Sequence, residues 1–260
     1  MTLGYTMVGQ GAEHVLVFHG WTSDHSVWSP IFPALDTDTF TYVFPDYRGY
    51  GKSKHIKGRY TMQEIANDMI ELLDHLGWRQ FHMIGHSMGA MAMQRLLVDI
   101  NDWQRVKSAV AVTPVPASGA QLDERSWAMF EASITDDNCR QTIMDFTTGK
   151  RLPKVWLEKM VQESRATTTE EAYASYLKAW VYNDFSELVI GLNTPILTLV
   201  GECDYAITEP SMLATYIRWF PNATLEVLCN SGHYPMQETP LAFVSAIERY
   251  MKRFVLVPVF

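Results

Sequence analysis

The chain has 260 residues, 47% of them hydrophobic and 19% charged, with a formal net charge of -8. This composition suits one folded domain with a sizeable core, and the acidic balance argues against nucleic acid or an anionic membrane as a partner. The N-terminus lacks a secretory signal pattern, no apolar run reaches the roughly 18 residues of a membrane span, and the 3 cysteines without metal-ligand spacing predict a cytoplasmic protein with reduced thiols.

Six short apolar runs, taken in chain order, predict strands that are covered on both faces. They lack strict alternation of polar and apolar residues, which is typical of a parallel sheet. Stretches with helical spacing separate them, and this pattern predicts the α/β class with a mostly parallel central sheet flanked by helices. The predicted strands are residues 14–20, 41–46, 81–86, 106–112, 195–201 and 224–230.

The helix predicted over residues 61–77 carries signals at both ends. Thr61 and Glu64 fit a capping box at its start, and Gly77 fits its C-terminal stop. An amphipathic stretch over residues 241–254 predicts a final helix. The apolar residues 254–260 are expected to pack against the body of the protein rather than against another subunit. The expected oligomeric state is a monomer or a homodimer.

Residues 114–192 break the alternation of strands and helices. Helix-like stretches there carry many Trp, Tyr and Met residues. We interpret this segment as a helical cap inserted between two strands, with residues 1–113 and 193–260 forming the core. Its side chains suggest an apolar substrate of small to medium size, although they could equally form the core of the cap. The candidate substrate contacts are Trp28, Trp127, Trp156 and Trp180.

The stretch MIGHSMGAM, residues 83–91, places Ser87 between Gly85 and Gly89. A predicted strand precedes this serine and a predicted helix follows it, which is the context of a nucleophile elbow. Glycines on both sides let the helix approach the strand closely. The serine Oγ would then lie near a helix N-terminus, where developing negative charge is favoured.

A serine nucleophile needs a base and an acid that orients the base. In this architecture the acid and then the histidine follow the serine along the chain. Asp204 follows a predicted strand that ends at Gly201, and His233 lies between the last strand and the final helix. We expect His233 to take the proton from Ser87 and Asp204 to hold the imidazole tautomer. Glu202 is a weaker candidate for the acid.

The backbone N–H groups of Trp21 and Met88 are the predicted oxyanion donors. Met88 directly follows the nucleophile, and Trp21 follows a His-Gly pair at the end of the first central strand. His86 is expected to pack or to form hydrogen bonds beside the elbow. The loop over residues 45–53 matches no phosphate-binding pattern and is interpreted as structural.

These motifs together resemble the α/β-hydrolase superfamily, and in particular its cap-bearing group of esterases, enol-lactonases and non-haem haloperoxidases. The matching stretches are HGW, DYRGYGKS, GHSMGA, GECDYAIT and GHYPMQETP, in the family's order. The resemblance implies the triad Ser87, Asp204 and His233, the Trp21 and Met88 N–H groups as the oxyanion hole, and no cofactor or metal. Serine at the nucleophile position argues against the epoxide hydrolases and haloalkane dehalogenases, which carry aspartate there.

The predicted function is serine hydrolysis of a carboxylic ester or lactone through an acyl-enzyme, with the small-molecule substrate as the only expected partner. A C–C bond hydrolase or an acyltransferase would use the same residues. A ligand-sensing receptor of this fold would retain them without rapid turnover. Cofactor-free dioxygenases of the fold place the acid after the strand that ends here at Thr113, where no carboxylate occurs, so that alternative is less favoured.

Overall fold

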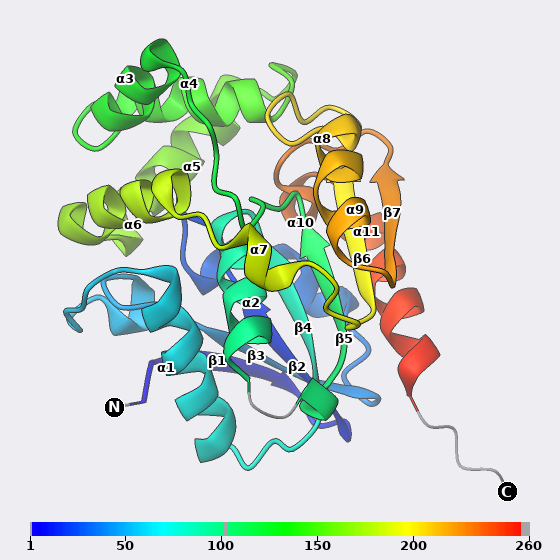
Figure 1. The fold of residues 1–260 in the computed structure, drawn as a ribbon. Coiled ribbons are helices and arrows are strands. Elements are labelled where there is room, and N and C mark those ends of the chain that lie inside the picture. The colour runs from blue at the N-terminus through cyan, green and yellow to red at the C-terminus, as the bar shows by residue number, and fades with distance from the viewer. Residues whose placement is uncertain (1, 101–102, 256–260) are drawn as a thin grey trace, which may run out of the picture.

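The centre of the molecule is a twisted sheet with strand order β1-β3-β2-β4-β5-β6-β7 (Figure 1). The computed structural model describes residues 2–100 and 103–255. β1 pairs antiparallel with β3, and the other pairs are parallel. The strands are β1 Tyr5–Gly9, β2 Glu13–Phe18, β3 Phe40–Pro45, β4 Phe81–His86, β5 Val106–Val112, β6 Ile196–Gly201 and β7 Ala223–Leu228.

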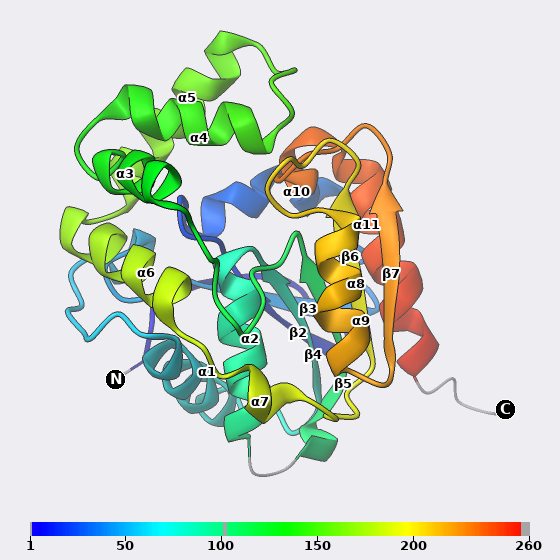
Figure 2. The same ribbon diagram turned by 45° about the horizontal axis from the view of Figure 1, so that its top comes forward.

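Helices cover both faces of this sheet and extend beyond its edge (Figures 1 and 2). The longer ones are α1 Met62–His75, α2 Met88–Asp99, α3 Glu124–Ala132, α4 Asp137–Thr147, α5 Lys154–Thr167, α6 Glu170–Tyr182 and α11 Pro240–Met251. The short ones are α7 Ser186–Val189, α8 Glu209–Ala214, α9 Tyr216–Trp219 and α10 Pro235–Glu238, with 3-10 turns η1 His25–Ala34, η2 Gly51–Ser53, η3 Trp103–Arg105 and η4 Lys252–Phe254.

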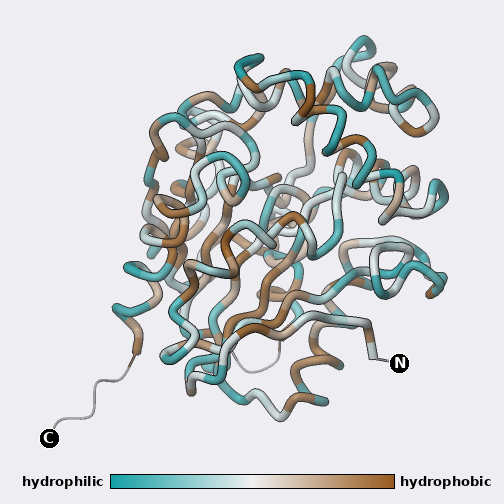
Figure 3. Tube along the Cα trace, turned by 180° about the vertical axis from the view of Figure 1, so that it is seen from behind, coloured by the Kyte–Doolittle hydropathy of each residue, from teal (hydrophilic) through white to brown (hydrophobic). Residues whose placement is uncertain are grey.

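The predicted α/β class and mostly parallel sheet are confirmed, and each predicted strand has a counterpart. Successive residues of β5 enter different cores: Ala109 packs with α1 and α2, whereas Val110 packs with η1 and α11. This two-sided burial explains the lack of polar alternation along the strands. Figure 3 shows the hydrophobic residues concentrated along the central strands. The sequence interpretation missed β1, a short, half-buried edge strand.

Helix α1 begins and ends where the sequence predicts, with one difference. The Thr61 hydroxyl accepts from the Glu64 N–H at 3.1 Å, but the Glu64 carboxylate accepts from the N–H groups of Arg59 and Tyr60 rather than closing a capping box. At the other end Gly77 has a φ of 70°, and the Trp78 N–H donates to the Leu73 carbonyl, as in a Schellman motif.

Residues 114–192, which we call the cap segment, contain helices α3–α7 between β5 and β6. Figure 2 shows α3–α6 grouped above the core. The division into core and cap domains stays a prediction.

In the apolar tail, Phe254 and Val255 pack partly buried against the η1 and α11 core, and residues 256–260 lie outside the described residues. Within the described ranges, no helix is both long and apolar enough to cross a bilayer.

Candidate active site

Ser87 occupies a strained turn between β4 and α2. Its φ of 54° and ψ of -121° are rare for a residue with a side chain. The Ser87 N–H donates to the Val112 carbonyl at 2.9 Å, which ties the turn to β5. A Cβ atom at Gly85 would lie 2.8 Å from the Ala90 Cα, and one at Gly89 would lie 2.4 Å from the His19 carbonyl oxygen. Both glycines are therefore needed for the close approach of helix and strand.

The structure brings Ser87, His233 and Asp204 together from three separate loops. The Ser87 Oγ lies 3.0 Å from Nε2 of His233, and Nδ1 of His233 lies 2.6 Å from Oδ2 of Asp204. A carboxylate can only accept, so the Nδ1–H donates to Asp204 and Nε2 is left with a lone pair for the serine hydroxyl. The other oxygen of Asp204 accepts from the N–H groups of Ala206 and Ile207. This arrangement can remove a proton from Ser87.

The rival acid Glu202 lies elsewhere. Its carboxylate accepts from the Asn230 N–H at 2.9 Å, and its side chain is exposed.

At the end of β5 the Thr113 hydroxyl, in place of a carboxylate, donates to the His233 carbonyl at 3.0 Å. Nε2 of His86 lies 2.8 Å from the same carbonyl oxygen. Burial holds the pKa of His86 well below its usual value, so this histidine is neutral and donates from Nε2, in agreement with its predicted hydrogen-bonding role.

The N–H groups of Trp21 and Met88 have no hydrogen-bond acceptor within residues 2–100 and 103–255. Met88 is the first residue of α2, where an N–H has no intrahelical partner. Trp21 is held on two sides: its carbonyl accepts from the Tyr50 hydroxyl, and its indole N–H donates to the Tyr173 carbonyl of α6, both at 2.7 Å. The Trp21 ring stacks on the Tyr173 ring at 4.0 Å. The loop that carries the Trp21 N–H is therefore fastened to the cap segment.

A cavity of about 90 Å³ adjoins Ser87 and His233. Core and cap residues line it together, and the lining contains no Asp, Glu, Lys or Arg. The lining residues are Trp21, Thr22, His86, Ser87, Val115, Pro116, Ala120, Phe130, Ile143, Thr147, Trp180, Ile207, His233 and Tyr234.

Of the four tryptophans expected to contact substrate, only Trp180 lines this cavity. The other three are not among its lining residues. Trp28 is fully buried among core aromatic rings on the η1 side of the sheet. The Trp127 ring packs against the Tyr182 ring with their centroids 5.0 Å apart, and the Trp156 and Tyr234 ring centroids are 5.9 Å apart.

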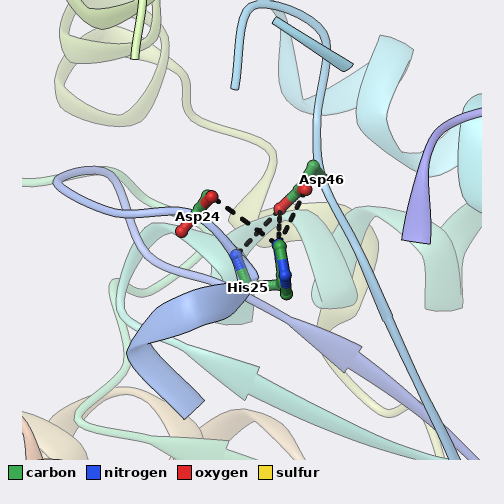
Figure 4. A group of neighbouring side chains, drawn as sticks. All are labelled: Asp24, His25 and Asp46. Atoms are coloured by element: carbon green, nitrogen blue, oxygen red, sulfur yellow. Dashed lines mark hydrogen bonds and ion pairs between the residues drawn. The ribbon is translucent and has the colours of Figure 1, made fainter. Parts of the chain in front are cut away.

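A second polar cluster joins Asp24 and His25, where η1 begins, to Asp46, which directly follows β3 (Figure 4). The side-chain atoms that could bind a metal ion lie within 4.8 Å of one another. These atoms form hydrogen bonds and ion pairs with one another instead. Nδ1 of His25 lies 2.8 Å from Oδ2 of Asp46, and the Asp46 carboxylate also accepts from the backbone N–H groups of His25 and Lys52. Burial lowers the pKa of His25, but its bond to Asp46 outweighs burial and leaves the pKa raised. The cluster is an ion pair that joins two loops, which fits the structural interpretation of residues 45–53.

Known proteins resemble this chain in sequence and in fold. Residues 13–240 match the model of the alpha/beta hydrolase fold family. The chain belongs to this family. It is 28% identical over 258 residues to 3-oxoadipate enol-lactonase 2 of Acinetobacter baylyi, covering 98% of this chain and 94% of the relative.

Two solved esterase structures share the fold of this α/β hydrolase. The esterase of Exiguobacterium antarcticum has a TM-score of 0.86 at 18% identity, with 96% of this chain and 95% of the esterase covered. A thermophilic esterase of Thermogutta terrifontis has a TM-score of 0.81 at 24% identity, with 97% and 93% covered. At these identities the likeness concerns the fold.

Proposed function

We propose that this α/β hydrolase is a serine esterase or lactonase that acts on a small, uncharged, apolar substrate. The observation that carries the proposal is the continuous hydrogen-bonded path from Ser87 through His233 to Asp204 at the wall of a cavity. The enol-lactonase relative and the esterase neighbours support the same reaction class.

In the proposed reaction, the Ser87 Oγ attacks the carbonyl carbon of the substrate while Nε2 of His233 takes the hydroxyl proton. The oxyanion that forms accepts hydrogen bonds from the N–H groups of Trp21 and Met88. Collapse of the tetrahedral intermediate breaks the bond to the leaving oxygen, which receives the proton from His233. Water then attacks the acyl-enzyme with His233 as base, and release of the acid restores Ser87.

The cavity supports an uncharged substrate with a short acyl group. Because no Lys or Arg lines the cavity, a carboxylate bound there would lack a permanently charged partner. An oxoadipate lactone, as named for the Acinetobacter relative, carries such a carboxylate. An apolar cavity of about 150 Å³ holds benzene, so about 90 Å³ fits an acyl group of only a few heavy atoms while the cap segment keeps its position.

A substrate panel tests this function. Purified protein, Ser87→Ala and a control would be assayed on aryl acetate, butyrate and octanoate esters, a neutral lactone and a lactone that bears a carboxylate. The control is Ser126→Ala, at a half-buried serine of the cap segment that does not line the cavity. We expect multiple turnovers on acetate or butyrate esters or on the neutral lactone, with activity lost only in Ser87→Ala. Equal turnover by Ser87→Ala would contradict the proposal, and labelling of Ser87 without turnover would favour a ligand-sensing role.

A further inference from the structure

The last residue of α4 and the turn that follows it, residues 147–151, lie against the loop that carries His233. We call these residues the α4 turn. The His233 N–H donates to the Thr147 carbonyl at 3.1 Å. Four residues later, the Arg151 guanidinium forms an ion pair with the carboxylate of Glu238, whose side chain is 1% exposed. The cap segment therefore contacts this loop through a backbone hydrogen bond, and an ion pair joins it to the neighbouring Glu238.

The Glu238 carboxylate also forms hydrogen bonds with the two residues that flank His233. One of its oxygens accepts from the Gly232 N–H and the other from the Tyr234 N–H, both at 2.8 Å. Together with the bond to Thr147, the N–H groups of three consecutive residues are held. The carbonyl of His233 accepts from His86 and Thr113. The backbone of the base is thus fixed from both sides, and the cap segment supplies part of the fixation.

The same turn also packs against the loop that carries the acid. A Cβ atom at Gly149, which has a φ of +71°, would lie 2.8 Å from the carbonyl oxygen of Cys203, the residue before Asp204. On the other side, a Cβ atom at Gly232 would lie 2.7 Å from the Thr148 Cα. These close approaches leave no room for the α4 turn to shift without moving one of the two loops.

We propose that the α4 turn positions the proton relay, with Arg151 as a positioning residue that acts through Glu238 on His233. The base then has its hydrogen-bonding geometry toward Ser87 only while the cap segment sits on the core. Any movement of α4 that admits a substrate also loosens His233, and closure restores it. This inference rests on the proposed hydrolysis at Ser87.

The electrostatics of Glu238 agree with this role. Burial raises the pKa of the Glu238 carboxyl, and the two backbone N–H groups and Arg151 act in the opposite direction. His233 and Tyr234 are the titratable groups that also face it. Loss of the Arg151 charge would raise the pKa of the Glu238 carboxyl further, and a protonated carboxyl accepts hydrogen bonds from the flanking N–H groups more weakly than a carboxylate does.

The test compares Arg151→Gln, the conservative Arg151→Lys and a control, Arg165→Gln, by steady-state kinetics on the best ester of the panel. Arg165 belongs to the same cap segment, but its ion pair partner is Asp137, also within the cap. We expect Arg151→Gln to lower kcat by about 10- to 100-fold, since small misplacements of reacting groups have effects of this order, with KM changed less than about threefold. Arg151→Lys should recover most of kcat, and Arg165→Gln should stay within twofold of the parent.

Circular dichroism melts would confirm that the variants are folded. A folded Arg151→Gln protein with unchanged kcat would overturn the inference, and so would an effect on KM alone or an equal loss in Arg165→Gln. If the parent itself shows neither turnover nor labelling of Ser87, the proposed function fails first. If the parent is active and Arg151→Gln matches it, only the inference about the α4 turn fails.

Discussion

Nδ1 of His233 lies 2.6 Å from Oδ2 of Asp204, and both side chains are almost fully enclosed by protein. A charge-assisted hydrogen bond this short is strengthened by exclusion of water. It fixes which imidazole nitrogen carries the proton. The consequence is that Nε2 faces Ser87 as an acceptor.

Replacing Asp204 with Asn is expected to reverse that tautomer. The amide oxygen can still accept from the N–H groups of Ala206 and Ile207, which leaves the amide NH2 facing His233. Nδ1 must then accept, Nε2 carries the proton, and Ser87 loses its base. We expect kcat to fall by roughly 10³- to 10⁴-fold with KM little changed, in steady-state assays.

Glu202→Gln is the matched control, because Glu202 lies two residues away but does not contact His233. It should keep kcat within twofold of the parent. Comparable losses in the two variants would mean that the negative charge of this loop matters, rather than the specific bond to His233.

Gly20→Ala is expected to disturb the oxyanion donors. The added Cβ would lie 2.8 Å from Nδ1 of His86 and 3.4 Å from the Ser87 Cβ, so the His86 ring or the loop that carries the Trp21 N–H must shift. Loss of one oxyanion donor costs about 10²- to 10³-fold in kcat, and a displaced donor should cost about 10-fold or more.

Gly77→Ala controls for the general cost of losing a glycine. Gly77 has a positive φ, but a Cβ there meets nothing within 4 Å. This variant should lose about 1 kcal/mol of stability without loss of kcat. Unchanged kcat in a folded Gly20→Ala protein would contradict the assignment of this loop to the oxyanion hole.

His82 predicts a pH dependence of stability. It is fully buried, with Nδ1 2.7 Å from the Ser108 hydroxyl and Nε2 3.3 Å from Glu13, which also pairs with Lys107. Burial, followed by the charge of Lys107, lowers its pKa to about 4. In the unfolded chain the His82 imidazole therefore binds a proton as the pH falls through about 6.5, whereas in the folded chain it stays neutral until the pH approaches about 4. Stability should fall as the pH drops from about 6.5 to about 4, by on the order of 3 kcal/mol.

Urea unfolding at pH 7 and pH 4.5 measures this effect. Burial also lowers the pKa of His19 and His86, so all three histidines contribute to the change of stability with pH. The difference between the parent and His82→Gln gives the contribution of His82 alone. A variant with the same loss of stability as the parent would show that His82 is not responsible.

The sequence was sufficient for features that depend on local order. Ser87 is flanked by a strand, a helix and two close-packing glycines, and these signals are all contained in nine residues. The loops of Asp204 and His233 follow strands of a parallel sheet, whose carboxyl ends meet at one edge. Their approach to Ser87 could therefore be predicted without knowing a single contact.

The contacts of the cap segment could not be predicted in this way. A tryptophan in a cap helix can face the cavity or pack against other cap side chains. For Trp127 and Trp180, which of the two occurs depends on residues that are distant in the sequence. The hydrogen bonds that Glu238 accepts from the residues flanking His233 were also not predicted, although its position five residues after His233 was a usable signal. Its partner Arg151 lies 87 residues away along the chain, and no local pattern joins the two.

The most direct test of the central claim is covalent labelling of Ser87. Folded protein would be treated with a fluorophosphonate, which reacts with activated serines, and the adduct located by peptide mass spectrometry, with Ser87→Ala and heat-denatured protein as controls. The account predicts one adduct, on Ser87, that is absent in both controls and strongly reduced in Asp204→Asn. An unlabelled Ser87 in folded protein, or labelling that persists in Ser87→Ala, would contradict it.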